Sequence, residues 1–225
     1  MTMQKIAEDL YLLDGFPKYA LNVYLMGGVL VDAGTPLAKG RILRQLKGEK
    51  LTAHALTHVH PDHQGASKAV CEAFNVPLYC GENDSDAMES GDFSAQMPLK
   101  MPKAVNSLLY GPPHPVTKRL CEGDEVGGFT VLDAPGHTPG QVVFWRESDR
   151  VLVMGDVLTG MNLLTTARGL HQPPRVGTID RALNIESARK LAKLNPEIVC
   201  FGHGPPWTDP DSFQAYVAQL PDAAS

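Results

Sequence analysis

Hydrophobic positions in the first third of the chain come in short bursts separated by glycine and proline. Such punctuation predicts strands joined by tight turns, and the opening of the chain is predicted to be antiparallel. Two longer segments instead place apolar residues at helical spacing. The predicted strands are 10–13, 21–26, 29–31, 51–57 and 76–80, and the predicted helices are 36–46 and 64–74.

The same two patterns return in the second half of the chain. Strands are predicted there at 129–133, 142–145, 151–154 and 198–201, and helices at 179–194 and 211–220. Strand and helix thus alternate along the sequence, which predicts a mixed α/β (α+β) architecture. The sequence shows no internal repeat at a fixed period.

The segment 81–118 between these two parts lacks a regular pattern. It is rich in Gly, Pro, Asp, Ser and Met, and only 105–109 shows weak helical spacing. An irregular segment of this length in a compact domain is usually functional or mobile. We therefore expect a lid over a site or a contact between two copies in a homodimer.

Length and composition limit the class of protein. With 225 residues, 43% of them hydrophobic, the chain suits one domain spanning 1–225 with a substantial core. The formal net charge of −5 gives no basic surface for nucleic acid. The chain starts with polar and acidic residues rather than a secretory signal, and no stretch approaches the ~20 apolar residues of a membrane span. A soluble, cytoplasmic protein is therefore expected.

Chemistry concentrates at the junction of a predicted strand and a predicted helix, in the run Thr57-His58-Val59-His60-Pro61-Asp62-His63-Gln64-Gly65. Residues two apart in an extended chain project to the same side, so His58 and His60 can bind one metal ion. Pro61 then turns the chain, and Asp62 and His63 can face a second position close to the first. Imidazole nitrogen and carboxylate oxygen are ligands that zinc accepts.

Three further residues of ligand type each follow a predicted strand and are flanked by glycine. They are His137, Asp156 and His203. Glycine lets the backbone turn tightly and leaves room beside a metal ion, so these residues can complete the coordination. A lone His-x-His pair would be weak evidence, but seven ligand types at the ends of strands together predict a two-metal site.

The sequence resembles the metallo-β-lactamase superfamily from its first predicted strands to His203. The family motif His-x-His-x-Asp-His matches 58–63, and the later His, Asp and His of the family match the three glycine-flanked residues in order. The resemblance implies a four-layered αββα sandwich with the metals at one edge between the sheets. It implies one ion at His58, His60 and His137, a second at Asp62, His63 and His203, and Asp156 bridging both.

The expected chemistry is hydrolysis. Two adjacent divalent ions can share a water, lower its pKa and direct the resulting hydroxide at an electrophilic carbon. A metal-bridging hydroxide is therefore the expected nucleophile, with Asp62 as the proton relay, and the sequence has no Gly-x-Ser-x-Gly motif for a serine nucleophile. Zinc is the expected metal, and the same ligands also suit iron and manganese.

A small acyl compound is the expected substrate, and its class stays open. The string at 135–140 is similar to that of glyoxalase-II-like thioester hydrolases, but only a short segment follows His203, whereas glyoxalase II carries an added glutathione-binding domain. Lactonases of the family usually have Tyr three residues after the bridging Asp, and Thr159 stands there. Thioester, lactone and other ester or amide substrates thus remain, with weak β-lactam turnover compatible.

An oxidoreductase is the alternative from a different class. Persulfide dioxygenases use one iron held by a similar set of His and Asp. The Cys-Gly-Arg string that they and glyoxalase II tend to carry after the bridging Asp is absent from 156–177. A non-catalytic metal-binding module is a third reading, which metal content and ester turnover would separate from the hydrolase.

The remaining histidines lie outside this set. His54 falls within the strand before the motif and is predicted to be a packed or edge residue, and His114 lies in a proline-rich loop. His171 follows Asp156 in an irregular segment and is a candidate for substrate contact. The sequence therefore predicts that none of the three binds a metal ion.

Overall fold

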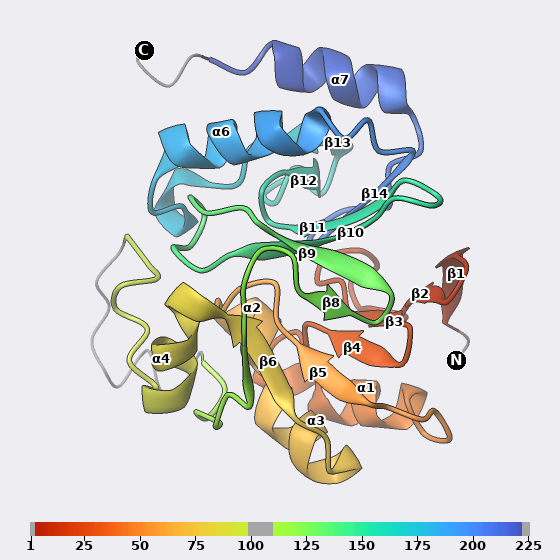
Figure 1. The fold of residues 1–225 in the computed structure, drawn as a ribbon, viewed down its shortest axis with the longest axis vertical. Helices are drawn as coiled ribbons and strands as arrows, with labels where there is room; N and C mark the ends of the chain where they lie inside the picture. Colours follow the sequence, from red (N-terminus) through yellow and green to blue (C-terminus); the bar gives the residue numbers. More distant parts are fainter. Residues whose placement is uncertain (1–2, 99–109, 222–225) are drawn as a thin grey trace.

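The computed structural model describes residues 3–98 and 110–221. Two β-sheets lie face to face at its centre, and helices cover the outer face of each sheet, as Figure 1 shows. The layers therefore run helix, sheet, sheet, helix, and the predicted αββα sandwich is confirmed. None of the helices in the described ranges combines the length and apolar character that a membrane-spanning helix needs.

The first sheet comes from the N-terminal half of the chain. Its strands lie in the order β1-β2-β3-β4-β5-β6-β7. Neighbours are antiparallel from β1 to β4 and parallel from β4 to β7. The bounds are β1 Gln4–Ala7, β2 Leu10–Leu12, β3 Tyr24–Met26, β4 Val29–Val31, β5 Ala53–Ala55, β6 Leu78–Gly81 and β7 Lys118–Leu120.

The second sheet comes from the C-terminal half, in the order β14-β11-β10-β9-β8. Only β11 and β14 are parallel neighbours among these described strands, and β12 and β13 form a separate hairpin. The bounds are β8 Glu125–Val126, β9 Phe129–Asp133, β10 Val142–Arg146, β11 Val151–Gly155, β12 Thr159–Met161, β13 Arg168–His171 and β14 Ile198–Phe201.

The helices divide between the two outer layers (Figure 1). Those on the first sheet are α1 Lys39–Gln45, α3 Ser67–Phe74 and α4 Glu82–Ser90, and those on the second are α6 Arg181–Ala192 and α7 Pro210–Ala218. Short helical turns lie at η1 Pro36–Ala38, α2 Pro61–Gln64 and η2 Arg175–Gly177. Two of these turns, α2 and η2, adjoin the predicted ligands.

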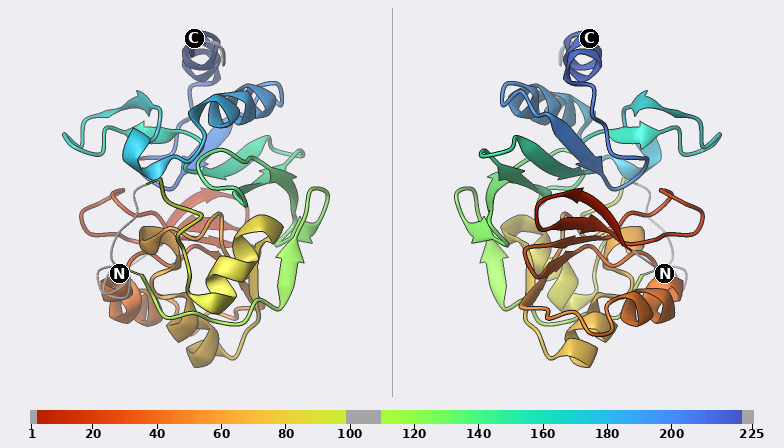
Figure 2. Two further views of the ribbon diagram at one scale, coloured as in Figure 1. Left: turned by 90° about the vertical axis from the view of Figure 1, so that its left-hand side faces the viewer. Right: turned by 90° about the vertical axis from the view of Figure 1, so that its right-hand side faces the viewer.

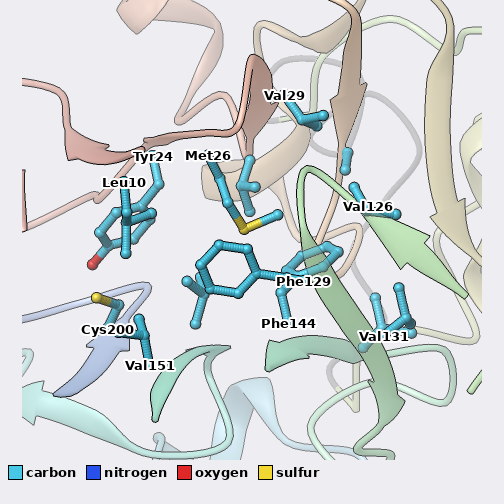
Figure 3. Close-up of a cluster of buried hydrophobic side chains, with 14 of the residues drawn as sticks. Leu10, Tyr24, Met26, Val29, Val126, Phe129, Val131, Phe144, Val151 and Cys200 are labelled. Atoms are coloured by element: carbon cyan, nitrogen blue, oxygen red, sulfur yellow. The ribbon is translucent and has the colours of Figure 1, made fainter. Parts of the chain in front are cut away.

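Apolar burial holds the layers together. Side chains such as Tyr24, Met26, Phe129 and Phe144 fill the space between the sheets, as Figure 3 shows. Separate clusters lie beneath the two helical layers, with Ile42 and Val70 among others under the first and Ile185 and Phe213 under the second. Each sheet is thus buried on both faces, which fixes the positions of the loops at its edges.

The structure agrees with most of the predicted elements and corrects two segments. Strands β12 and β13 form a hairpin in the segment after Asp156 that the sequence predicts to be irregular, and His171 ends β13. Helix α4 occupies the start of 81–118, where the sequence predicts an irregular segment. Two acidic residues, Glu82 and Asp84, lie in its first turn, where they favour a helix N-terminus, and Gly91 ends it with a φ of 75°. The weak helical spacing at 105–109 lies outside the described residues.

Candidate metal centre

The run after β5 carries four of the predicted ligands and stays extended up to His60. That residue has φ −67° and ψ 156°, and Pro61 starts α2. The side chains of His58 and His60 therefore project together, with His58 Nε2 3.1 Å from His60 Nδ1. Helix α2 then turns Asp62 and His63 back toward them, and the His58 and His63 rings lie 4.0 Å apart between centroids. The structure thus brings the four residues together as the spacing predicts.

The other three predicted ligands approach from the second sheet. Asp156 follows β11 and His203 follows β14, so two parallel neighbours deliver them to the same edge. Asp156 Oδ2 lies 3.0 Å from His203 Nε2. His137, in the loop after β9, places its Nε2 3.6 Å from the same carboxylate oxygen. The three residues therefore meet at one point although they are far apart in the sequence.

Together these residues form overlapping groups of donors. In the described ranges, three groups have donor atoms that all lie within 4.8 Å of one another. They are His58, His60 and His137; His58, His63 and Asp156; and Asp62, His63 and His203. The first and third are the two sets that the resemblance implies. Asp156 Oδ2 lies 3.6 Å from one member of each set, His137 Nε2 and His63 Nε2.

Hydrogen bonds to backbone carbonyl groups fix which nitrogen of His60 and His203 faces the centre. His60 Nε2 lies 2.8 Å from the carbonyl oxygen of Gln96, and a carbonyl can only accept. Nδ1 of His60 therefore keeps its lone pair for the centre. In the same way, His203 Nδ1 donates to the carbonyl oxygen of Ala20, which turns Nε2 toward the centre.

The rings of His58 and His137 are oriented through threonine hydroxyls. Thr57 Oγ1 donates to Asp32 Oδ2 at 2.8 Å, so it accepts from His58 Nδ1 at 3.0 Å. Thr178 Oγ1 donates to a carbonyl oxygen at 3.0 Å and accepts from His137 Nδ1 at 3.1 Å. In both rings Nε2 keeps its lone pair, as metal ligation requires.

Buried atoms without partners show whether a metal ion fits. His63 Nε2, His137 Nε2 and Asp156 Oδ1 are buried and have no hydrogen-bond partner within the described residues. Each such atom costs roughly 1–3 kcal/mol, so native structures rarely gather several in one place. Divalent metal ions bind this donor set of imidazole nitrogen and carboxylate oxygen. The residues therefore fit a metal centre.

The charges at the centre are strongly coupled. Burial and the neighbouring histidines lower the pKa of His58 and His137. Burial also opposes protonation of His203, but Asp156 raises the pKa of that ring to about 10. Although burial favours the neutral acid, His203 and His63 hold the pKa of Asp156 well below its ordinary value. Asp156 is thus ionised and ready to bind a cation, which would displace protons from its histidine partners.

One glycine leaves the room that the ligands need. A Cβ at Gly202 would lie 2.1 Å from Asp156 Oδ1 and 2.5 Å from His63 Cε1. Such distances are too short for any real contact, so a side chain at this position would displace two of the predicted ligands. The expectation that flanking glycine makes space at the centre is confirmed here.

Sequence reasoning missed the residues that hold the ligands from behind. Asp32 accepts from His63 Nδ1 at 2.9 Å, and Asp84 is fully buried beside the first donor group. Burial raises the pKa of Asp84 to about 6 against the hydrogen bonds that it accepts. A carboxylate directly after a buried strand, as Asp32 is, gives the same signal as Asp156 and could have been found. Thr178 carries no comparable signal.

The remaining histidines lie away from the donor groups. His54 is buried in β5, where Nδ1 lies 2.9 Å from the Leu30 carbonyl oxygen and Nε2 lies 2.8 Å from Ser67 Oγ. The prediction that it is a packed residue is confirmed. His171 pairs with Thr159 across the β12–β13 hairpin and belongs to none of the groups in the described ranges. Its contact with substrate stays a prediction.

Comparison with known proteins gives an independent result. A model of the metallo-beta-lactamase superfamily matches residues 19–203. The probable metallo-hydrolase YflN of Bacillus subtilis is 31% identical over 221 residues, which cover 88% of this chain and 82% of YflN. The hydroxyacylglutathione hydrolase of Bdellovibrio bacteriovorus is 26% identical over 175 residues, which cover 77% of this chain and 56% of that enzyme.

A solved structure of TTHA1623 in a di-iron-bound form is similar as well. It is 29% identical to this chain with a TM-score of 0.62, and the match covers 92% of this chain and 94% of the other. The region that the family model matches, residues 19–203, includes all the loops that bear the donor groups.

Proposed function

This chain belongs to the metallo-beta-lactamase superfamily, and from that premise we propose that it is a metal-dependent hydrolase of a small acyl substrate. The observation that carries the proposal is the pair of three-residue donor groups with Asp156 beside both. A binding module would need only one such group. Two donor groups that lie side by side, with Asp156 next to both, favour a reaction in which two ions act on the same substrate molecule.

We assign the first metal position to His58, His60 and His137, the second to Asp62, His63 and His203, and a shared role to Asp156. The orientation of each ring, with its free nitrogen toward the centre, supports this assignment. When bound, the ions would supply a water of lowered pKa and a Lewis acid for the acyl oxygen. Zinc is the proposed metal, and the di-iron-bound relative supports iron as the alternative to test.

Asp62 is the proposed proton relay because it is the most exposed of the seven residues. Its side chain is 33% exposed, whereas those of His203 and Asp156 are 4% and 5% exposed. Asp62 Oδ2 lies 3.3 Å from His203 Nε2, so one carboxylate faces both the donor groups and the outside. The Asp62 carboxylate can therefore accept a proton at the centre and release it to water.

The surroundings of the centre support an acyl group with an apolar part. Val176 is 67% exposed in η2, and the next residue, Gly177, would place a Cβ 3.8 Å from His137 Cε1. Leu164 is 94% exposed on the β12–β13 hairpin, whose Gly160 N–H donates to the His203 carbonyl oxygen at 2.7 Å. Figure 2 shows the hairpin and the loop between β2 and β3 projecting from the same side of the molecule.

A thioester is the first substrate class to test, because one relative is a hydroxyacylglutathione hydrolase. Lactones, other esters and amides come next, with β-lactams as a weak activity. The test is elemental analysis of the purified protein together with a panel of thioester, lactone, β-lactam and phosphodiester substrates. We expect about two metal ions per chain and cleavage of one acyl class that chelation abolishes and added metal restores.

Two results would contradict the proposal. Cleavage that persists after complete removal of metal would exclude the proposed centre from catalysis. About one iron per chain, no hydrolysis and oxygen uptake with a persulfide would instead favour an oxidoreductase of the persulfide dioxygenase type. Substrates with longer acyl chains should also have a lower KM than acetyl compounds if the exposed Val176 and Leu164 contact the substrate.

A further inference from the structure

Asp84 is a fully buried carboxylate in the first turn of α4 that neither the motif nor the donor groups include. Its Oδ2 accepts from Thr138 Oγ1 at 2.7 Å and from the Val59 backbone N–H at 3.3 Å. Its Oδ1 accepts from the Gly140 N–H at 2.9 Å. Every one of these partners lies in a loop that bears a proposed metal ligand.

These partners all lie in the loops that carry one of the two donor groups. Val59 lies between His58 and His60, and Thr138 directly follows His137. Within the described part of the chain, none of the hydrogen bonds that Asp84 accepts comes from the loops that carry the second group. Asp84 therefore joins the two loops of the three-histidine group from behind.

We propose that Asp84 is a positioning residue that sets the geometry of the three-histidine position and so controls metal binding there; this rests on the proposed function. It has a counterpart on the other side. Asp32 accepts from His63 and from the Thr57 N–H and hydroxyl. Asp32 thus holds a ligand of the second group directly and, through Thr57, orients the His58 ring of the first, whereas the partners of Asp84 lie only in the loops of the first group.

The packing around Asp84 shows that its position is tightly defined. A Cβ at Gly140 would lie 2.3 Å from Asp84 N and 2.7 Å from Asp84 Cγ. A Cβ at Gly81, the residue before α4 that caps it, would lie 2.0 Å from the Gly140 carbonyl oxygen. Two glycines are therefore needed for α4 of the first layer to reach the His137 loop of the second sheet. This contact joins the two halves of the sandwich at the metal centre.

Asparagine cannot replace the carboxylate in this setting. The Asp84 carboxylate accepts from Thr138, Val59 and Gly140, besides the Gln96 side chain. Asparagine offers one oxygen and one N–H₂ group, which can only donate. In either orientation of the amide, at least one of these donors would face another donor. The substitution nevertheless keeps size and shape, so its effect reports the hydrogen bonds rather than a cavity.

The test compares Asp84→Asn with Asp86→Asn in the full-length protein. Asp86 lies in the same helix, but its carboxylate is 85% exposed and pairs with Arg119. Each metal-free protein is titrated with cobalt(II) while its visible absorption is recorded, and the stability of the metal-free protein is measured by thermal unfolding. We expect Asp84→Asn to lower the affinity for one of the two cobalt equivalents by roughly 10–100-fold and to change the absorption spectrum of that equivalent. The affinity and spectrum of the other equivalent should be the same as in Asp86→Asn.

A second pair of variants changes Thr138, the donor in the hydrogen bond to Asp84 Oδ2. Thr138→Val removes the hydroxyl with little change in volume, whereas Thr138→Ser keeps it. We expect Thr138→Val to lower the affinity for the same metal equivalent that Asp84→Asn affects. Thr138→Ser should bind that equivalent as tightly as the wild type. This pair decides the question if Asp84→Asn fails to fold.

The outcomes separate this inference from the proposed function. If Asp84→Asn lowered the affinity for both metal equivalents equally, or for neither, the positioning role of Asp84 would be overturned. The proposed metal centre would not be affected by that result. A wild-type protein without two metal equivalents would contradict the proposed function instead. Amide exchange in the metal-free protein then still tests the positioning role: Asp84→Asn should speed exchange at Val59 and Gly140 roughly tenfold, and unchanged exchange would overturn it.

Discussion

His63 Nδ1 lies 2.9 Å from Asp32 Oδ2, and this contact turns the opposite ring nitrogen toward the metal centre. Asp32 directly follows β4 and has a φ of 61°, a conformation that residues other than glycine rarely adopt. Its other oxygen accepts from the Thr57 backbone N–H at 2.8 Å. One carboxylate therefore holds both the start of the ligand run and its last histidine.

Asp32→Asn should weaken metal binding at the position of Asp62, His63 and His203. An amide in place of the carboxylate loses its charge and turns a donor toward His63 or Thr57, so the ring is no longer fixed. The loss should be roughly 10–100-fold in affinity for one metal equivalent, measured by competition with a chelator of known affinity. Equal affinities in variant and wild type would show that the carboxylate does not orient the ring.

Replacing a proposed metal ligand should reduce metal binding more than replacing a residue, such as Asp32, that orients a ligand. His60→Ala and Asp156→Ala remove donors from the centre itself, so each should lose most of the bound metal and abolish hydrolysis of the acyl substrate. Circular dichroism should show that the fold is retained, because the sheets are held by apolar packing far from these side chains. Retained hydrolysis in both variants would exclude the proposed centre.

His54→Ala and His171→Ala test the boundary of the ligand set. Neither residue belongs to a donor group in the described part of the chain, so both variants should keep the full metal content. Elemental analysis of the purified variants is the measurement. Loss of one metal equivalent in either would show that the set of ligands is incomplete.

The sequence predicts where the candidate ligands lie because four of the seven follow an apolar strand. A buried strand is recognisable from its composition, and a histidine or aspartate that follows it must lie at the edge of a sheet. His58, His137, Asp156 and His203 all satisfy this rule in the structure. The four-layered arrangement, by contrast, followed from the family resemblance, since alternating patterns do not specify how two sheets pack.

The supporting residues were not predictable because they depend on contacts between distant segments. Asp84 lies 54 residues from its partner Thr138, and no local pattern links them. Helix α4 was missed for a related reason. Its residues are mostly polar and only one face is buried, so hydrophobic spacing gave no signal, although the acidic first turn and the following glycine mark its ends.

Gly202→Ala should disrupt the centre more than any other conservative change. The added Cβ would lie 2.1 Å from Asp156 Oδ1, so either the carboxylate or the β14 loop must move. We expect loss of metal and of activity with the sheets intact. Gly40→Ala is the matched control, because Gly40 lies in α1 with no heavy atom within 4 Å of the added Cβ. That variant should keep full activity and gain roughly 0.5–1 kcal/mol in stability.

The stability of the metal-free protein should fall between about pH 6.5 and pH 4 because of His54. Burial lowers the pKa of this ring to about 4, from an ordinary value of 6.5. As the pH falls through this window, the unfolded chain takes up a proton that the folded protein does not, so unfolding becomes more favourable. The contribution lost is on the order of 3 kcal/mol and is complete once the pH reaches the folded pKa.

Urea unfolding of wild type and His54→Asn over this range measures the contribution. Asparagine can still donate to the Leu30 carbonyl oxygen, which His54 Nδ1 contacts at 2.9 Å, but it does not titrate. The variant should be less stable at pH 8 and should lose less stability toward pH 4, so the two curves converge. Ser67→Ala removes the hydroxyl at Nε2 and should keep the wild-type pH dependence, because burial is the main cause of the shift. Parallel curves for wild type and His54→Asn would show that the ring accepts a proton in the fold as easily as in the unfolded chain.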